Sequence, residues 1–548
     1  MKSRILITAA FAAVLLSSCV KIDGRMGSGL VDSSLQYDTY TAEFSLDNLQ
    51  MKMADNLSGF SDTRITVGAI RDDVFGLTTR SSAFALIPAE DTLDLGKNPV
   101  PVKFDIHFAC DSISCADESQ AHILQNINVF ALTKPLNSKE SGTNQDLSYG
   151  NVRVSRGVPI CNGSDSLSFE FTKAFAQEYL DKIAALENED HKISSYDDYV
   201  AALPGIYISV DPPAGNGGRI NLFELSCLAL SSGQYYRNSN VALLTINSEY
   251  NGVRKDTTFL FIPGEPAFYY EADYLKDNNK FYQYAFNRTS HETRAQEGTA
   301  GEYAYIEGGG GLKPVVLASE LREKALAIIG AKGGDPAKTI INHATIYLPF
   351  EVEGGNYEAL DMFPSVISPT CMIQTDTSVT FAGLSDASAS TENQGDIDRS
   401  NLTYRPDITH HFQELIRLQD LTTLSRYDIW FLTVHTETVE TSNSSAYDSE
   451  YLQQLMYAQY YNSLYGGYGG YGYGGYGYGY GGYGGYGGYS NYYNYLMLAQ
   501  YMSNYNSSST TTTQELDKDR YYRGILNGPA TSKARKPKVK ITFSVPKK

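Results

Sequence analysis

Val100-Pro101-Val102-Lys103-Phe104-Asp105-Ile106-His107-Phe108 is the stretch that decides the fold class. From residue 102 onward apolar and polar side chains alternate strictly, which is the period of a β-strand with one buried face. The apolar members of this alternation are Val102, Phe104, Ile106 and Phe108. A second apolar run, Ile127–Leu132, follows and is expected to pair with the first across a loop. Both features predict a β-rich protein.

The expected loop between these two runs contains Cys110 and Cys115. Such closely spaced cysteines could form a local disulfide if the host oxidises its envelope, and the alternative is a set of buried thiols. The chain has 6 cysteines in all. No cysteine or histidine spacing matches a zinc site, so no metal ligand and no cofactor are expected.

Helical patterns are short and few. Residues 173–203 carry apolar side chains at intervals of three or four, then stop at Pro204-Gly205, and are expected to form a helical insertion. Further short helices are predicted near 317–329 and 410–418, the second capped within Asp407-Ile408-Thr409. The fold class is therefore mainly β, with two β-sandwich-like domains and short helices at their ends.

The expected organisation divides the chain by composition and pattern. A polar, tyrosine-rich stretch near residues 263–300 suggests a boundary between the two β-rich parts. The segments are a signal peptide (1–18), a lipidated tether (19–35), a first β-rich domain (36–280) and a second β-sandwich domain (300–545). The second domain is interrupted by a Tyr/Gly-rich insertion over 440–515.

The insertion has an unusual centre, because residues 465–489 consist of ten tyrosines and fifteen glycines. Glycine at this density loses too much conformational entropy to form a packed core. The segments on either side, 455–460 and 496–501, repeat apolar residues at helical spacing. We expect either a pair of helices joined by a flexible Gly-Tyr tip or a wholly disordered insertion.

The beginning of the chain predicts where the protein is located. Two basic residues, Lys2 and Arg4, precede an apolar run over 5–16, and Leu16-Ser17-Ser18-Cys19 follows. The run is too short to span a bilayer and has the layout of a secretory signal peptide. Its end resembles the bacterial lipobox, so Cys19 is expected to be acylated and to become the first mature residue. Several acyl chains would hold the protein durably on a membrane.

Charge and composition exclude one class of partner. The net charge of −18 disfavours nucleic acid, whose phosphate backbone needs a basic surface. Hydrophobic residues make up 42% of the chain, which is ample for packed cores.

Several motifs resemble chemical sites and fail on inspection. Gly308–Lys313 is glycine-rich, but Pro314 follows the lysine where a phosphate loop needs Ser or Thr. Asp396–Asp407 begins like a calcium loop yet lacks the glycine at position six and the glutamate at position twelve. His410-His411 is not a metalloprotease motif, and we expect it on a capped surface helix. Trp430 lies in an apolar strand and is expected in a core. We therefore predict no catalytic residues.

Several short stretches together resemble an uncharacterised outer-membrane lipoprotein family of Bacteroidota, known only as a domain of unknown function. The stretches are Asp73–Thr79, Leu203–Ile208, Tyr305–Gly309, Ile341–Ala344, Asp407–Thr409 and Tyr522–Leu526. The Gly-Tyr block does not belong to the pattern. The resemblance implies a secreted, lipid-anchored, β-rich protein and carries over no catalytic residues. Because only Asp23 lies near Cys19 where some such lipoproteins carry an acidic run, the periplasmic and cell-surface faces both stay open.

Three functions are compatible with these observations. The first is a non-enzymatic module that binds or scaffolds envelope proteins, with the Gly-Tyr tip as contact element, since tyrosine offers large area and a polar group. The second is a glycan-binding accessory lipoprotein of a nutrient-uptake system. The third is an adhesin or pilus-like subunit that uses the C-terminal strand as a donor.

Overall fold

The computed structural model describes most of the chain outside the leader and the Gly-Tyr insertion. The described residues are 36–61, 64–88, 92–137, 142–164, 166–187, 190–193, 196–225, 240–264, 285–292, 297–374, 379–384, 386, 395–441 and 509–547. Residues 1–35, with the expected signal peptide, Cys19 and the expected tether, lie outside these ranges, as do residues 442–508 and the expectations that concern them.

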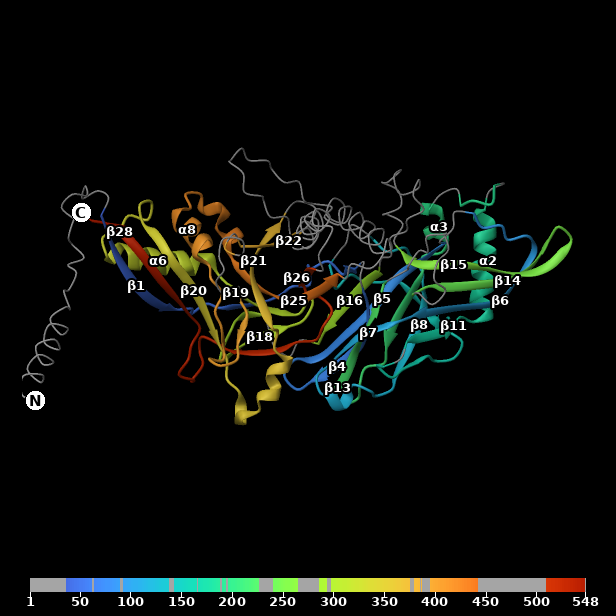
Figure 1. Cartoon of the computed structure of the whole chain (residues 1–548), viewed down its shortest axis with the longest axis horizontal. Coiled ribbons are helices and arrows are strands. Elements are labelled where there is room, and N and C mark those ends of the chain that lie inside the picture. The colour runs from blue at the N-terminus through green and yellow to red at the C-terminus, as the bar shows by residue number, and fades with distance from the viewer. Residues whose placement is uncertain are drawn as a thin grey trace, which may run out of the picture.

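The described chain is mainly β, with antiparallel sheets and few short helices, as the alternation pattern predicts. The molecule is elongated (Figure 1). One end carries the first and last strands of the chain with two helices beside them, and the other end carries α2 and a long hairpin. None of the described helices is long and apolar enough to cross a membrane.

The largest sheet of the described chain has 14 strands, all drawn from residues 60–291. Its strands are β3 (Phe60–Ser61), β4 (Arg64–Asp72), β5 (Gly76–Pro88), β6 (Lys97–Phe108), β7 (Cys110–Cys115), β8 (Gln125–Leu132), β9 (Tyr149–Arg153), β10 (Ile160–Cys161), β11 (Leu167–Glu170), β12 (Ile206–Val210), β13 (Gly217–Glu224), β14 (Ala242–Tyr250), β15 (Val253–Gly264) and β16 (Ala285–His291). Its main path is β10-β8-β12-β5-β15-β14-β6-β11.

Three further sheets use the second half of the chain. The five-stranded sheet has the order β1-β28-β20-β24-β23 and contains β1 (Tyr37–Ser45), β28 (Lys538–Pro546), β20 (Ile340–Pro349), β24 (Thr403–Tyr404) and β23 (Ile397–Asp398). The seven-stranded sheet contains β17 (Gly298–Thr299), β2 (Gln50–Met53), β19 (Leu312–Val316), β25 (Ile429–Thr441), β21 (Val366–Gln374), β22 (Val379–Gly383) and β26 (Ser509–Leu516). The last pairs β18 (Tyr303–Glu307) with β27 (Arg523–Asn527).

The helices are short. They are α2 (Lys173–Leu186), α3 (Tyr196–Ala202), α6 (Ala318–Ala331) and α8 (Thr409–Arg417), with 3₁₀ turns η3 (Glu118–Gln120), η4 (Glu353–Gly355), η5 (Tyr357–Met362) and η6 (Leu421–Tyr427). All three expected helical regions are therefore present.

Helix α2 shows how sequence produces both element and packing. The Thr172 side chain accepts a hydrogen bond from the Phe175 N–H and so caps the first turn. Ala176, Tyr179, Leu180 and Ile183 recur at helical spacing and are buried in the core beneath the large sheet. The Tyr179 hydroxyl donates to the Leu86 carbonyl oxygen at 2.8 Å, which fixes the helix to β5.

Residues 100–108 lie in strand β6, and Val102 departs from the expected alternation of buried and exposed side chains. Phe104, Ile106 and Phe108 are buried, whereas Val102 is 47% exposed. The register of β6 against β14 shifts between Thr245 and Ile246, so the alternation is broken near Val102.

The expected pairing of β6 with residues 127–132 is wrong. Strand β8 pairs with β12, β9 and β10, whereas β6 pairs with β14 and β11. We expected β6 and β8 to pair because they are close in sequence. The strands that pair with them, such as β14 with β6 and β12 with β8, are more distant in the chain.

The expected start of the first domain at residue 36 also differs from the observed sheets. Strand β1 pairs along its whole length with β28, and β2 pairs with β17 and β19. Residues 37–53 thus lie with strands of the second half. Conversely β16, from the expected boundary region, pairs with β3 and β5 of the large sheet.

Candidate functional site

Of the two alternatives for Cys110 and Cys115, a local disulfide or free thiols, the structure has free thiols. The two residues are the ends of strand β7, where Cys110 is opposite Phe223 and Cys115 opposite Arg219 on β13. Five steps along an extended strand separate their Cα atoms by roughly 16 Å. A disulfide requires about 4.4–6.8 Å. The segment is a strand where a loop was expected, so its two thiols cannot meet.

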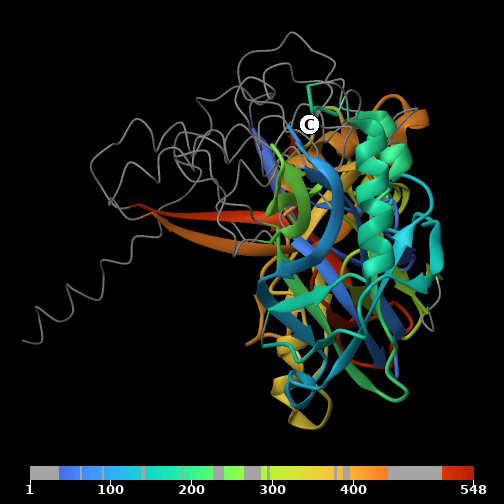
Figure 2. The ribbon, with the colours of Figure 1, turned by 90° about the vertical axis from the view of Figure 1, so that its right-hand side faces the viewer.

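Strands β25 and β26 form a two-stranded ribbon that leaves the seven-stranded sheet. Residues Val366–Cys371 of β21 pair with β25 only from Ile429 to Val434. From Val434 to Thr441, β25 pairs with β26. Figure 2 shows this ribbon, in orange and red, projecting sideways from the body. Residues 442–508 are inserted in sequence between its two strands.

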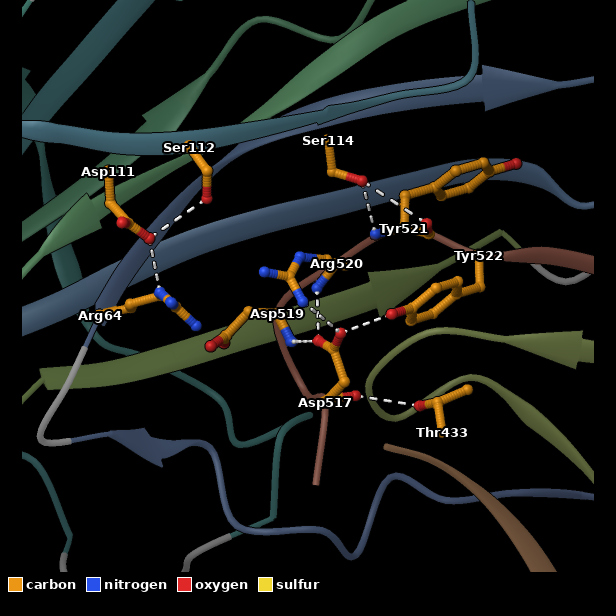
Figure 3. Close-up of polar contacts among 10 residues, drawn as sticks. All are labelled: Arg64, Asp111, Ser112, Ser114, Thr433, Asp517, Asp519, Arg520, Tyr521 and Tyr522. Carbon is orange, nitrogen blue, oxygen red and sulfur yellow. Dashed lines mark hydrogen bonds and ion pairs between the residues drawn. The ribbon is translucent and has the colours of Figure 1, made fainter. Parts of the chain in front are cut away.

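Asp517 fixes the root of the ribbon (Figure 3). Its N–H donates to the Thr433 carbonyl oxygen at 2.9 Å, and the Thr433 hydroxyl donates back to the Asp517 carbonyl oxygen at 3.0 Å. The Asp517 carboxylate accepts from the N–H groups of Asp519 and Arg520 at 3.1 and 3.0 Å. It also accepts from the Tyr522 hydroxyl at 2.6 Å. One buried carboxylate therefore shapes the whole turn after β26.

The segment after Asp517 also contacts the large sheet of the first half. The Lys518 amine donates to the carbonyl oxygens of Ser58 and Phe60 at 3.0 and 2.9 Å. The Tyr521 N–H donates to the Ser114 hydroxyl at 2.9 Å, and Arg523 forms an ion pair with Asp72 at 2.9 Å. We call residues 517–523 the seam segment, because it joins the ribbon to the first-half sheet.

Buried charges lie behind the seam segment. Arg80 of β5 is almost fully buried, and burial lowers its pKa to about 10, against the opposing effect of Asp519, Asp517 and Glu307. Its guanidinium donates to the Thr289 hydroxyl. Burial together with the neighbouring Asp517 raises the pKa of the Asp519 carboxyl. These groups compensate one another's charge, so the arrangement is that of a structural network.

The Lys313 side chain occupies the turn formed by the glycine-rich stretch Gly308–Lys313. Its buried amine donates to the carbonyl oxygens of Glu307, Gly309 and Gly311, the last two at 3.0 and 3.3 Å. A phosphate loop presents N–H groups to an anion. Here the turn presents carbonyl oxygens to a cation of its own chain, which agrees with the sequence argument against a phosphate site.

A hydroxyl, an imidazole and a carboxylate are hydrogen-bonded in series on β20 and the segment before α8. The Thr345 hydroxyl lies 2.8 Å from His343 Nε2, and Asp407 Oδ2 lies 3.0 Å from His343 Nδ1. The order matches that of a nucleophile, base and orienting acid. The structure thus brings together two stretches that carry the family resemblance.

Three backbone N–H groups near this series already have acceptors. Thr345 is buried, and the nearby Ala344 N–H already donates to the Thr409 hydroxyl at 2.9 Å. In the first turn of α8, the N–H groups of His410 and His411 donate to the Asp386 carboxylate at 2.5 and 3.0 Å. Because these amides are engaged, they cannot stabilise an oxyanion. The series clamps β20 to the start of α8.

Cys371 and His411 form the other nucleophile-like pair. Cys371 Sγ lies 3.9 Å from His411 Nδ1, and His411 Nε2 lies 3.0 Å from the Tyr427 carbonyl oxygen. Burial raises the pKa of the Cys371 thiol to about 12 and lowers that of His411 to about 4. Both groups therefore stay neutral, and a neutral thiol is a poor nucleophile. The expected surface position of this histidine is wrong, because α8 packs His411 inward.

The calcium-like stretch is also occupied by its own chain. Asp398 accepts hydrogen bonds from the N–H and side-chain amide of Asn401 at 2.9 and 2.8 Å and pairs with Arg405 at 2.7 Å. Within the described ranges no group of three or more His, Cys, Asp or Glu side chains could hold a metal ion. Trp430 is buried in a core with Phe381, as predicted.

Sequence reasoning missed the ribbon and the seam segment. Asp517, Arg80 and Lys313 are far apart in the chain, and no local pattern links them. Lys313 alone left a signal, since it interrupts the apolar run Leu312–Val316.

Comparisons of the chain with known proteins found no relative. The chain matches no family model, no curated protein and no solved structure.

Proposed function

We propose that this protein is a lipid-anchored, non-enzymatic module of the bacterial outer membrane that binds or scaffolds envelope partners. The leader ending in Leu16-Ser17-Ser18-Cys19 supports the anchor. The nucleophile-like groups described above are neutral or lie near N–H groups that already have acceptors, which supports a non-enzymatic role.

The observation that carries the proposal is the β25–β26 ribbon. An insertion placed at the end of such a ribbon can contact a partner without disturbing the sheets beneath it. The Gly-Tyr sequence of residues 465–489 supplies many aromatic rings with hydroxyl groups, and tyrosine is favoured at contact surfaces. We infer that the ribbon presents this segment to an envelope protein.

The proposed anchor limits how far the first described strand can lie from the membrane. The described chain begins beside β1 at one end of the long axis, and α2 lies at the opposite end (Figure 1). Between Cys19 and Gln36 the chain can reach roughly 60 Å at full extension. A lipid on Cys19 would therefore keep Gln36 within roughly 60 Å of the bilayer.

The ribbon proposal is tested by removing the tip. Deletion of residues 465–489, and a variant of equal length with the ten tyrosines changed to serine, should both lose envelope partners in pull-downs from native membranes. Thermal melting should be unchanged, because none of the described strands and helices includes these residues. If both variants retain the same partners as the unaltered protein, the Gly-Tyr segment is not the contact element.

The anchor is tested separately by mass spectrometry of the native protein and by Cys19→Ala. The acylated N-terminus should be found on Cys19, and the variant should leave the membrane fraction. A bare or absent Cys19 in the native protein would reject the anchor.

The pilus-like alternative receives no support from the C-terminal strand. Strand β28 pairs with β1 on one side and with β20 on the other. A donor strand must be able to leave its own sheet and enter another. The glycan-binding alternative does have a specific observation in its favour, on another face of the molecule.

A further inference from the structure

Three aromatic side chains meet on the outer face of the large sheet. On β12 the side chains of Ile206 and Ile208 enter the core, so Tyr207 between them points to the opposite face. Tyr149 of β9 stacks on Tyr207, with ring centroids 4.3 Å apart and 20° between the planes. Phe130 of β8 lies 5.5 Å from Tyr149.

Tyr149 is the exposed member of this trio. Its side chain is 46% exposed although one ring face is stacked on Tyr207, so the other face meets solvent. Tyr207 is buried beneath it. The stacked ring is held in place by its neighbours, so little conformational entropy remains to be lost when a ligand binds.

A chain of polar groups borders the aromatic trio. Arg153, on the same strand as Tyr149, donates through Nε to the Asn128 side-chain oxygen at 2.9 Å. The Asn128 amide donates to Asp211 at 2.8 Å, and the Asn126 amide donates to the same carboxylate at 3.4 Å. Arg153 and Asp211 are exposed, so the guanidinium and the carboxylate both face solvent beside the ring.

These groups suit a neutral ring that has an apolar face and hydroxyl groups at its edge. The C–H face of a pyranose packs on an aromatic ring, and its hydroxyls both donate and accept hydrogen bonds. Arg153 can donate to such hydroxyls and Asp211 can accept from them. An anionic ligand is disfavoured, because Asp211 offsets the charge of Arg153. Ile160 is exposed and lies opposite Asn126 on the neighbouring strand, so it belongs to the same face. It offers an extended ligand an additional apolar contact.

We propose that the Tyr149 face binds a pyranose ring of a neutral oligosaccharide. Tyr149 supplies the stacking surface for one ring, and Arg153 and Asp211, farther along the same face, hold hydroxyl groups of the oligosaccharide. The inference rests on the proposed role as a binding module, but it uses neither the ribbon nor the Gly-Tyr segment.

The test uses full-length lipoprotein in detergent and native affinity electrophoresis in gels that contain soluble mannan, dextran, xylan or galactan. At least one polysaccharide should retard the unaltered protein. Tyr149→Ala and Arg153→Gln should each weaken that retardation by about tenfold or more, as loss of a central contact does. Tyr149→Phe keeps the ring and should bind nearly as well. Tyr357→Ala removes a tyrosine that is 61% exposed on η5 and should change nothing.

Several outcomes would overturn the inference. One is that none of the four polysaccharides retards the unaltered protein. Another is that Tyr149→Ala is retarded as strongly as the unaltered protein. A third is that Tyr149→Ala loses a protein partner in pull-downs while its retardation by polysaccharide is unchanged. Equal melting temperatures of Tyr149→Ala and Tyr357→Ala exclude unfolding as the cause. Deletion of 465–489 should leave polysaccharide binding intact, so failure of the ribbon proposal is distinguishable from failure of this one.

Discussion

At the scale of single residues, the protein uses buried charge to fix turns. Lys313 and Asp517 lie in different parts of the chain, and each organises a turn through several hydrogen bonds to one charged group. The Leu312 N–H donates to the Glu307 carboxylate at 2.8 Å, which closes the same glycine-rich turn. Removing one partner of such a buried network leaves the other uncompensated, which costs several kcal/mol.

Lys313 should make stability depend on pH. Burial lowers its pKa to about 7, below the ordinary value of a lysine. Between pH 7 and the ordinary lysine pKa, the unfolded chain then binds more protons at this site than the folded chain, so stability rises with pH by up to about 1.4 kcal/mol per unit. Below pH 7 the contribution is constant. We expect Lys313→Met to lose this rise, measured as the free energy of unfolding in urea between pH 7 and 8.5.

The control for this prediction is Lys338→Met, which changes an exposed lysine. It should keep the slope of the unaltered protein. A Lys313→Met protein with the same slope as Lys338→Met would show that the buried amine is not the titrating group.

At the scale of elements, short-range patterns predicted the right types of structure. The helical spacing in residues 173–186 produces α2, and the alternation after residue 103 produces the buried face of β6. We expected His411 on a surface helix because it is polar, but it is buried on the inner face of α8. Asp386, a residue outside the helix, caps it together with Asp407, whose carboxylate accepts from the Thr409 N–H at 2.9 Å.

The turn between α3 and β12 requires glycine at position 205. Gly205 has a φ of 110°, and an added Cβ would lie 2.1 Å from the Phe84 carbonyl oxygen. We expect Gly205→Ala to destabilise the protein by about 3 kcal/mol or more, since both backbone strain and overlap with β5 oppose it. Gly215→Ala places its Cβ in open space and should cost under about 1 kcal/mol. Denaturant unfolding of the two variants compares them directly, and equal midpoints would contradict the prediction.

At the scale of the whole molecule, the two ends of the described chain form one edge of a sheet. Strand β28 lies between β1 and β20, and its Val539, Ile541 and Phe543 side chains are fully buried. The first described strand is thus held by the last one. Folding of this end must await synthesis of the C-terminus.

Truncation after Lys536 should therefore abolish folding of the second-half core. It removes the strand that lies between β1 and β20, so both lose their hydrogen-bonding partner and the core loses Val539, Ile541 and Phe543. We expect aggregation or rapid proteolysis of the truncated protein in a limited trypsin digest. Truncation after Pro546 keeps β28 and should be resistant. Equal protease resistance of the two proteins would show that β28 is dispensable.

The sequence by itself determined the fold class, the positions of the helices and the burial of Trp430, because these follow from local periodicity and composition. It also supplies the expected anchor at Cys19, since a lipobox is a contiguous motif. Only the tertiary structure decided that β8 does not pair with β6, that Cys110 and Cys115 lie on one strand, and that β1 pairs with β28. The same holds for the seam segment and for the Tyr149 face. These features depend on contacts between residues far apart in the chain. Packing of the whole sheet decides which strands pair, and no local sequence pattern predicts that pairing.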